Sequence, residues 1–565
     1  MGAECRYELR AGPARRRRDP SGAARPARLP AQTRPVPAVS YSETVPDQAD
    51  SARRAPEVVL LGARLTIDHV DSIARGRAGA AIDPQADSRI AASRAVVERA
   101  LADNAVVYGV TTGFGSLADV RLDPDRSTLL QHSLIRSHAV AVGRELSSEE
   151  VRAMLALRAH VLALGYSGVR REVANRFVEL LQHDILPVVP EQGSLGASGD
   201  LAPLAHLALG ALGEGQVRYA GEKMPAAEAL RRAGLAPIEL GAKEGLALIN
   251  GTQGMTAIGA LAAHRGHTLA KSADISAVLT IEAILGTDRA FDPRVVALRP
   301  HPGQQCVARN LIRLAGESEI LASHRDSNHI VQDAYSVRCA PQVHGAYRDV
   351  LARATEVLEI EIGSVSDNPI VLADDDEILS CGNFHGQPVA HALDSLAAAT
   401  VSLASICERR LYRLLDVKTS NGLPPFLVGE AGVNSGFMVC QYTAASLVSE
   451  SKSMAHPAGV DSITSSAGQE DHVSMGMIAS RHARECVTNA EVVVAMEVLA
   501  GAQGCDLRAP LRAGRGTSAA VAAVRQVIAP LIRDRELKPD VDAAIELVRS
   551  GALVEAVESE IGALE

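Results

Sequence analysis

The sequence contains no tryptophan, and aromatic residues make up only 3% of its 565 residues. Alanine and leucine are abundant instead, and both favour helices over strands. Because 47% of the residues are hydrophobic, a chain of this length can bury a large core. The composition therefore predicts a mainly α protein.

The eight cysteines include no CxxC or CxxH pair, so the sequence lacks the usual pattern of a disulfide framework or a zinc site. Scattered, unpaired cysteines are typical of reduced and mostly buried thiols. We therefore expect a cytoplasmic protein without a metal site.

Long apolar runs and an excess of positive charge are missing as well. The longest uncharged stretches, such as residues 395–407, are shorter than the roughly 20 apolar residues that a membrane span needs. The N-terminus lacks the apolar core of a secretory signal. The formal net charge of −10 argues against a general affinity for nucleic acid. The sequence predicts neither a membrane nor a nucleic-acid partner.

Residues 1–55 differ from the rest of the chain, with eleven arginines, no lysine, six acidic residues and seven prolines. A segment of this composition is a poor candidate for any packed element. Three interpretations stay open. They are a disordered tail, translated sequence upstream of the true start, and an arginine-rich targeting or nucleic-acid-binding arm, which the abundant proline disfavours.

The most informative segment is Gly-Ser-Leu-Gly-Ala-Ser-Gly-Asp-Leu-Ala-Pro, residues 193–203. Its centre, Ala197-Ser198-Gly199, has the small residues that a backbone cyclisation needs, because glycine permits a very tight turn. If the Gly199 nitrogen attacks the Ala197 carbonyl carbon with loss of water, and Ser198 then loses its hydroxyl, the product is a methylidene-imidazolone (MIO) electrophile. The alternative is an ordinary small-residue turn.

A helix is predicted directly after this segment. Asp200 is a good N-cap residue, Pro203 falls in the first turn, and apolar residues within 201–212 keep helical spacing. Gly213 and Gly215 are natural stops. The electrophile would then lie at the positive end of a helix dipole, where developing negative charge is stabilised.

Helical periodicity runs long beyond about residue 260, and residues 386–416 are the best example. Several such helices in a chain of this size predict a long bundle. The segments between residues 56 and 260 are shorter and mixed. We therefore predict a disordered tail (1–55), a mixed N-terminal MIO-bearing domain (56–260) and a long-helix bundle domain (261–565).

The longer string from Gly193 to Gly215 resembles the MIO-forming segment of the aromatic amino acid ammonia-lyases. Further motifs follow in that family's order from about residue 57 to about residue 550. The resemblance implies a long central helical bundle of the ammonia-lyase/fumarase type. It also implies a carbon–nitrogen lyase whose MIO forms autocatalytically from Ala197-Ser198-Gly199, with no external organic cofactor. The assembly that it implies is a homotetramer with active sites drawn from more than one subunit.

The resemblance also assigns catalytic roles. In the family's mechanism the substrate amine adds to the electrophile and a base then removes the β proton. Tyr108, within residues 107–115, matches the candidate base, and this role requires a lowered tyrosine pKa. The catalytic residues implied in this way are Tyr108, Ala197, Ser198, Gly199, Tyr335 and Glu470.

A second set matches residues that surround the electrophile and the substrate. Arg338 has the planar guanidinium that holds a carboxylate with two hydrogen bonds, and Tyr335 lies three positions before it, on the same face if the segment is helical. The substrate-binding residues implied by the resemblance are His138, which would contact the substrate ring, Asn250, Gln332, Arg338 and Phe384.

Glu470, in Gln-Glu-Asp-His-Val-Ser-Met at residues 469–475, occupies a position where phenylalanine and tyrosine lyases generally carry a neutral amide. A carboxylate can accept an imidazole N–H, whereas a phenyl ring would leave it desolvated and unpaired. The resemblance thus implies L-histidine as the small-molecule substrate, with urocanate and ammonia as products. Asp471 and His472 have no supporting ligand cluster and are interpreted as structural.

One position departs from the family pattern, because Gly468 stands where the family commonly has asparagine. This exchange removes an amide and loosens the backbone just before Glu470. The rival interpretations are a tyrosine or phenylalanine lyase or aminomutase, which shares everything except the Glu470 signal, and a non-catalytic scaffold on the same fold. A fumarase-type lyase is disfavoured because the sequence has no Gly-Ser-Ser-x-Met-Pro loop.

Overall fold

The computed structural model describes residues 57–103, 105–113, 124–327 and 331–565, so the predicted tail lies outside the described residues. The first part of the described chain mixes strands with helices of moderate length. Its elements are β1 (Glu57–Leu61), α1 (Ile67–Ala74), β2 (Ala78–Ile82), α2 (Ala86–Ala102), α3 (Pro124–His138), β3 (Val142–Glu145), α4 (Ser148–Ala163), α5 (Arg171–Gln182), β4 (Leu186–Pro187), β5 (Pro190–Gln192), α6 (Leu201–Ala211), β6 (Gln216–Tyr219), β7 (Glu222–Pro225), α7 (Ala226–Ala233) and α8 (Glu244–Ile249).

The second part is almost entirely helical. It contains α9 (Gln253–Ala283), η2 (Arg289–Phe291), α10 (Pro293–Val296), α11 (Pro302–Leu314), α12 (Glu319–Ser323), α13 (Tyr335–Arg338), α14 (Ala340–Ile362), β8 (Ile370–Leu372), β9 (Glu377–Leu379), α15 (Gln387–Leu415), η3 (Pro425–Leu427), α16 (Met438–Met454), η4 (Ser466–Gly468), α17 (Gly476–Asp506), α18 (Arg515–Val527), α19 (Lys538–Arg549) and α20 (Ala552–Ile561). The predicted mainly α class is confirmed.

The strands form small sheets and no large one within the described part of the chain. Strands β1 and β2 are parallel, whereas β3 pairs with β5, β4 with β6, β6 with β7 and β8 with β9 in antiparallel fashion. Strand β5 is important for the site because it leads directly into residues 193–199.

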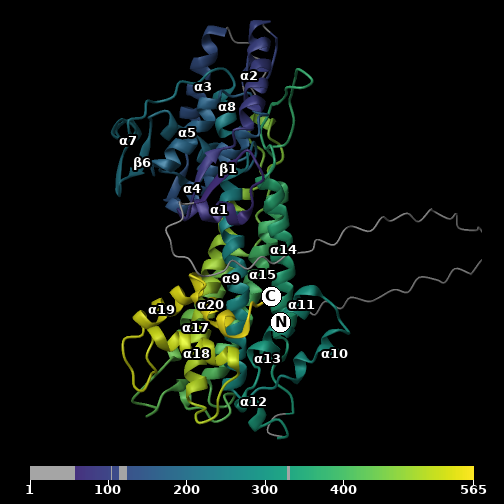
Figure 1. The fold of residues 1–565 in the computed structure, drawn as a ribbon, viewed down its shortest axis with the longest axis vertical. Coiled ribbons are helices and arrows are strands. Elements are labelled where there is room, and N and C mark those ends of the chain that lie inside the picture. Colours follow the sequence, from purple (N-terminus) through teal and green to yellow (C-terminus); the bar gives the residue numbers. More distant parts are fainter. Residues whose placement is uncertain (1–56, 104, 114–123, 328–330) are drawn as a thin grey trace, which may run out of the picture. The chain divides into compact units, whose positions relative to one another are not determined.

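Long helices form the core of the second part (Figure 1). Helix α9 packs against α14, α15 and α17, and α15 packs against α14, α16 and α17. Helices α9 and α17 each have 31 residues and are buried around most of their circumference, which their many alanines, leucines and valines allow. The predicted bundle is therefore present. Helix α9 runs through residue 260, and the division into domains at that residue stays a prediction.

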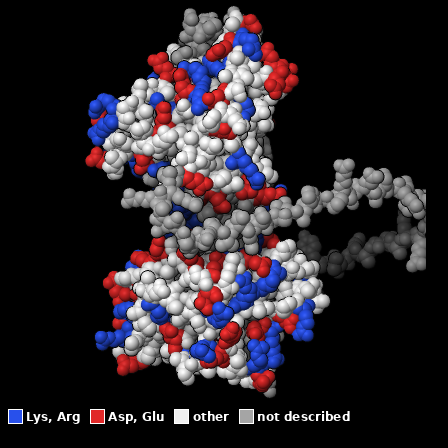
Figure 2. All heavy atoms as spheres, in the orientation of Figure 1, with Lys and Arg blue, Asp and Glu red and all other residues white. Residues whose placement is uncertain are grey.

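Helix α15 confirms the periodicity of residues 386–416. It is also the one described helix that is long and apolar enough to cross a membrane, with a mean hydropathy of 1.4 over its most apolar 18 residues. Of that stretch, 56% is buried against the rest of the chain. Packing inside the bundle thus accounts for its apolar character. On the face shown in Figure 2, acidic and basic side chains are intermixed.

Candidate active site

A cavity of about 640 Å³ brings together segments that lie far apart in the sequence. Its walls come mostly from the turn before α6, from the loop between β9 and α15, and from the loop before α17, with Tyr108 and Asn368 added from two other loops. The residues that line it are Tyr108, Ala197, Ser198, Asn368, Ser380, Cys381, Gly382, Phe384, His385, Gln469, Glu470, Asp471 and His472.

The turn at residues 197–199 is held tightly against the segment before α9. The Gly251 N–H donates to the Ser198 carbonyl oxygen at 3.3 Å, and the Asp200 N–H donates to the Gly251 carbonyl oxygen at 2.7 Å. Gly199 has a φ of +77°, and a Cβ at this position would lie 2.1 Å from the Gly251 oxygen. Only glycine fits here, because any side chain would collide with backbone.

Helix α6 begins at Leu201 as predicted, but the Asp200 side chain does not cap it. Its carboxylate instead accepts hydrogen bonds from the Ser194 hydroxyl at 2.8 Å and from the Met255 N–H at 2.7 Å, in the first turn of α9. Burial raises the pKa of Asp200 to about 6. Asp200 thus occupies the predicted N-cap position, but its carboxylate is engaged by Ser194 and the start of α9 and does not cap α6. Asp200 links the turn to α9.

Glu470 faces Ser198 across the cavity. The Ser198 hydroxyl lies 3.5 Å from Glu470 Oε1, and the Ser465 hydroxyl donates to Glu470 Oε2 at 2.7 Å. Gly468 has a φ of +91°, and a Cβ at this position would meet no atom within 4 Å. Sequence reasoning missed Ser465, which holds the carboxylate from a position five residues upstream.

Two further predicted residues, Tyr108 and Phe384, also line the cavity. Asp471 and His472, interpreted as structural from the sequence, line it too, and the His472 ring stacks on that of His385 with 5.8 Å between centroids. No cluster of three or more histidine, cysteine or acidic side chains that could hold a metal occurs among the described residues.

Asn250 lies behind the cavity wall and is 2% exposed. Its Nδ2 donates to the Asn368 carbonyl oxygen at 2.8 Å, and Asn368 lines the cavity. Asp367, next to Asn368, forms a fully buried ion pair with Lys243 at 3.1 Å. Asn250 is thus placed to support the wall from behind.

Besides Gly199 and Asn250, four predicted residues do not line this cavity in the single chain: His138, Gln332, Tyr335 and Arg338. His138 ends α3, where its Nδ1 lies 2.8 Å from the Leu134 carbonyl oxygen. Gln332 lines a separate cavity of about 110 Å³. The Arg338 guanidinium stacks 4.6 Å from the centroid of the Tyr335 ring, which confirms that the two side chains lie on one face.

Comparison with known proteins identifies the family. The model of the aromatic amino acid lyase family matches residues 65–526. The chain belongs to this family. It is therefore a carbon–nitrogen lyase.

Similar proteins within the family agree with this assignment. The chain is 52% identical over 514 residues to a histidine ammonia-lyase of Sorangium cellulosum, covering 90% of this chain and 100% of the relative. A second relative, a histidine ammonia-lyase of Symbiobacterium thermophilum, is 52% identical over 509 residues with the same coverage.

Solved structures show the same fold. The histidine ammonia-lyase of Trypanosoma cruzi has a TM-score of 0.83 and 42% identity, covering 89% of this chain and 96% of that chain. The tyrosine aminomutase of Streptomyces globisporus has a TM-score of 0.85 and 36% identity, covering 90% of this chain and all of that chain.

Members of this lyase family are MIO-dependent, and the residues at positions 197–199 fit that group. The tripeptide is a tight turn, Ser198 faces the cavity, and the Gly251 N–H contacts the carbonyl oxygen that would belong to the ring. The backbone contacts around Gly199 leave no room for a larger residue.

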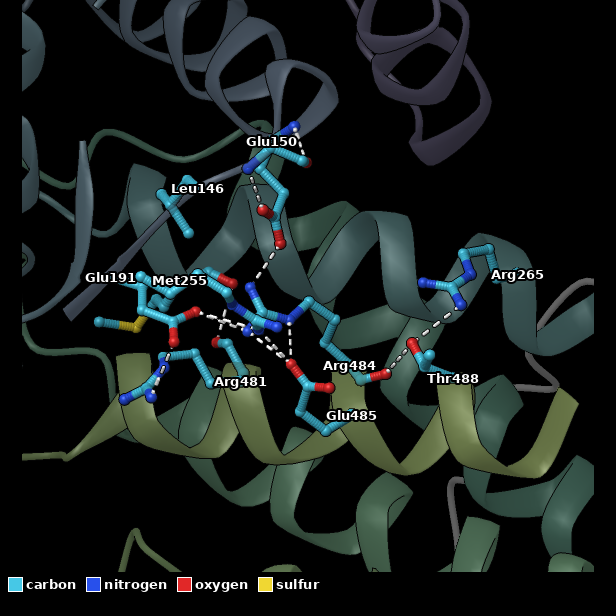
Figure 3. Close-up of polar contacts among 12 residues, drawn as sticks. Leu146, Glu150, Glu191, Met255, Arg265, Arg481, Arg484, Glu485 and Thr488 are labelled. Carbon is cyan, nitrogen blue, oxygen red and sulfur yellow. Dashed lines mark hydrogen bonds and ion pairs between the residues drawn. The ribbon is translucent and has the colours of Figure 1, made fainter. Parts of the chain in front are cut away.

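A network of ion pairs connects α4, β5 and α17 (Figure 3). Arg484 in α17 donates to Glu150 Oε1 and to Glu191 Oε2, each at 2.7 Å. Glu191 Oε1 accepts from Arg481 at 3.2 Å. Burial raises the pKa of Glu191, but the hydrogen bond from Arg484 and the neighbouring arginine charges outweigh this effect and lower it.

This network joins the two segments that bear the facing groups. Glu191 is in β5, which leads into the turn, and α17 begins directly after residues 469–475. Between the segments the Met475 N–H donates to the Leu195 carbonyl oxygen at 2.9 Å, and the Ser474 hydroxyl donates to the Gly196 carbonyl oxygen at 3.2 Å. The ion pairs of Glu191 and these two hydrogen bonds thus both fix the distance between Ser198 and Glu470.

Proposed function

We propose that the chain deaminates L-histidine to trans-urocanate and ammonia, the first step of histidine degradation. The observation that carries this proposal is the position of the Glu470 carboxylate, 3.5 Å from the Ser198 hydroxyl across the cavity. A carboxylate can accept the N–H of an imidazole, while the phenyl ring of L-phenylalanine offers no hydrogen-bond donor and would leave the carboxylate unpaired. The names of the two bacterial relatives support the same substrate.

The turn at Ala197, Ser198 and Gly199 would form MIO autocatalytically, and this group would supply an electrophilic carbon for the substrate amine. No external organic cofactor is needed in this scheme. Tyr108 would take the β proton from the substrate, since its side chain is at the cavity wall. Phe384 would exclude water from one side of the reacting atoms.

Glu470 would orient the substrate ring with Oε1, because Oε2 is engaged by Ser465. Asn250 would act with Asn368 at the wall behind the substrate. The contact of His138 with the substrate ring also belongs to this proposal.

The predicted carboxylate-binding group, at and just before α13, would reach the cavity of a second copy of the chain. Gln332, Tyr335 and Arg338 do not line the cavity of their own chain, and Tyr335 is 71% exposed. We propose a homotetramer in which α13 of one subunit completes the cavity of another, so that Arg338 receives the substrate carboxylate. The unpaired state of the seven described cysteines supports the proposed cytoplasmic location.

The test is a panel of L-histidine, L-tyrosine and L-phenylalanine combined with peptide mass measurement. We expect turnover of L-histidine and a peptide containing residues 193–203 that is two waters lighter than its sequence. Ser198→Ala should abolish nearly all turnover and the loss of the serine hydroxyl. The control Ser380→Ala, also at the cavity wall, should keep the two-water loss. A preference for L-tyrosine would favour the aminomutase or tyrosine-lyase alternative, and active enzyme at full peptide mass would refute MIO.

A further inference from the structure

Arg158 is a buried cation just behind the turn at Ser198. Its side chain is fully buried in α4, and among the described residues no carboxylate lies within 4 Å of it. Nη1 donates to the Asn250 carbonyl oxygen at 3.0 Å and to Gln253 Oε1 at 2.5 Å, and Nη2 donates to the Ala247 carbonyl oxygen. Burial lowers the pKa of Arg158 to about 10, so the guanidinium keeps its charge at neutral pH.

Asp367 is the carboxylate whose charge opposes the lowering of the Arg158 pKa by burial, and it is engaged by another cation. Lys243 is close enough to Arg158 to depress the lysine pKa further, but it is paired with Asp367 at 3.1 Å. Asp200, whose N–H binds the Gly251 carbonyl oxygen, accepts hydrogen bonds with its carboxylate from Ser194 and from the start of α9. The hydrogen bonds of Arg158 therefore go to neutral oxygens only.

One peptide unit connects Arg158 with the turn. The Asn250 carbonyl oxygen accepts from Arg158, and the N–H of the same peptide, on Gly251, donates to the Ser198 carbonyl oxygen at 3.3 Å. A Cβ on Gly251 would lie 2.8 Å from Arg158 Nη1, so glycine is needed for this close approach.

A cation bound to a peptide oxygen draws electron density toward that oxygen and makes the N–H of the same peptide a stronger donor. Hydrogen bonds in series reinforce one another in this way, and the effect is larger where the surroundings are dry. The site is dry by this criterion, because Arg158, Asn250 and Gly251 are all buried. The charge of Arg158 is thus transmitted to the Ser198 carbonyl group.

We propose that Arg158 promotes the dehydration of Ser198 by polarising the Asn250–Gly251 peptide. The inference rests on the proposed function, since it concerns how the turn becomes an electrophile. Arg158 touches none of the reacting atoms and is a positioning residue.

The chemistry has two dehydrations. In the first, the Gly199 nitrogen bonds to the Ala197 carbonyl carbon, and the oxygen leaves as water with the Gly199 and Ser198 amide protons. In the second, Ser198 loses its Cα proton and its hydroxyl, which together make water, and a Cα–Cβ double bond forms. The electron pair released at Cα is delocalised onto the Ser198 carbonyl oxygen before the hydroxyl departs. The Gly251 N–H stabilises that negative charge.

The test measures how many waters the peptide with residues 193–203 has lost at fixed times after synthesis. We expect Arg158→Met to slow the loss of the second water by about tenfold, so that a species one water lighter accumulates. This effect is smaller than that of removing a direct oxyanion donor, because Arg158 acts through a peptide group. Arg158→Lys keeps the charge and should give an intermediate rate. A loss of stability alone would not halt the reaction after one water, so the count separates the two effects.

Arg176→Met is the matched control. Arg176 is 8% exposed in α5, donates to the main-chain carbonyl oxygens of Ala211 and Ala236 at 3.4 and 2.6 Å, and also pairs with Glu179 at 2.8 Å. This variant should lose stability but complete both dehydrations.

The outcomes separate the two proposals. If Arg158→Met lacks a cooperative thermal transition, Arg158→Lys decides the matter. Folded Arg158 variants that lose both waters as fast as the unaltered chain would overturn the inference alone. An unaltered chain at full peptide mass would overturn the proposed function first.

Discussion

Replacing Glu470 by glutamine tests how the cavity selects its substrate. In the structure Glu470 Oε2 accepts a hydrogen bond from Ser465 at 2.7 Å, and Oε1 is directed toward Ser198. A glutamine in the same place keeps the Ser465 contact by presenting its amide oxygen there. Its NH₂ then points into the cavity, where the imidazole N–H of L-histidine needs an acceptor. In the variant the glutamine NH₂ and the imidazole N–H, both donors, would thus face each other without an acceptor between them.

The magnitude follows from the type of bond that is lost. A hydrogen bond to a charged group contributes about 1.5 to 3 kcal/mol. Since about 1.4 kcal/mol corresponds to a factor of ten, kcat/KM for L-histidine should fall by about tenfold to about a hundredfold. If Glu470 also assists a proton transfer, the loss should be larger and should appear in kcat.

The assay is steady-state formation of urocanate, with L-phenylalanine as a second substrate. Asp471→Asn is the matched control, because it removes a neighbouring charge from the same cavity wall. We expect its kcat/KM to change much less than that of Glu470→Gln. L-Phenylalanine has no ring N–H, and Glu470→Gln should use it no worse. Unchanged L-histidine kinetics in Glu470→Gln would refute the assignment of the substrate.

Three other predictions concern stability and the tail. Glu191→Gln removes an 8%-exposed carboxylate from the Arg484 network, and it should lower the unfolding free energy by about 3 to 5 kcal/mol and reduce kcat. The control Glu491→Gln removes a 3%-exposed carboxylate farther along α17. It should lower the thermal midpoint without a comparable change in kcat. The pKa of Asp200 is raised to about 6 by burial, so the folded state binds a proton more tightly than the unfolded state. The stability that this proton gives is present below pH about 4 and is lost as the pH rises through about 6, and Asp200→Asn should abolish that part of the pH dependence of the thermal midpoint. Deleting residues 1–55 should leave turnover unchanged and the unfolding free energy within about 0.5 kcal/mol of the full chain, because the arginine- and proline-rich composition of this segment disfavours any packed element. A lost assembly would contradict this expectation.

Local signals in the sequence were sufficient for several elements. Helix α15 occupies residues 387–415 against the predicted 386–416, and α6 starts at Leu201 and ends before Gly213. Periodicity and helix-breaking residues act over a few positions, so they can be recognised without the rest of the fold. The Ala197-Ser198-Gly199 turn and the string around Glu470 were recognisable for the same reason.

Contacts between distant segments were decided only by the tertiary structure. The Asp200 carboxylate does not cap α6, because in its buried position it accepts hydrogen bonds from the Ser194 hydroxyl and the Met255 N–H. Asp471 and His472 line the cavity because the loop before α17 packs against the turn before α6.

Arg158 shows most clearly the difference between what local sequence signals reveal and what long-range contacts decide. Nothing within α4 marks this arginine, because its acceptors lie about 90 residues later in the chain. The sequence by itself determined the helical class, the Ala197-Ser198-Gly199 turn and the carboxylate at position 470, since each depends on neighbouring residues. Which buried groups face that turn depends on long-range packing, and only the folded chain brings them within hydrogen-bonding distance.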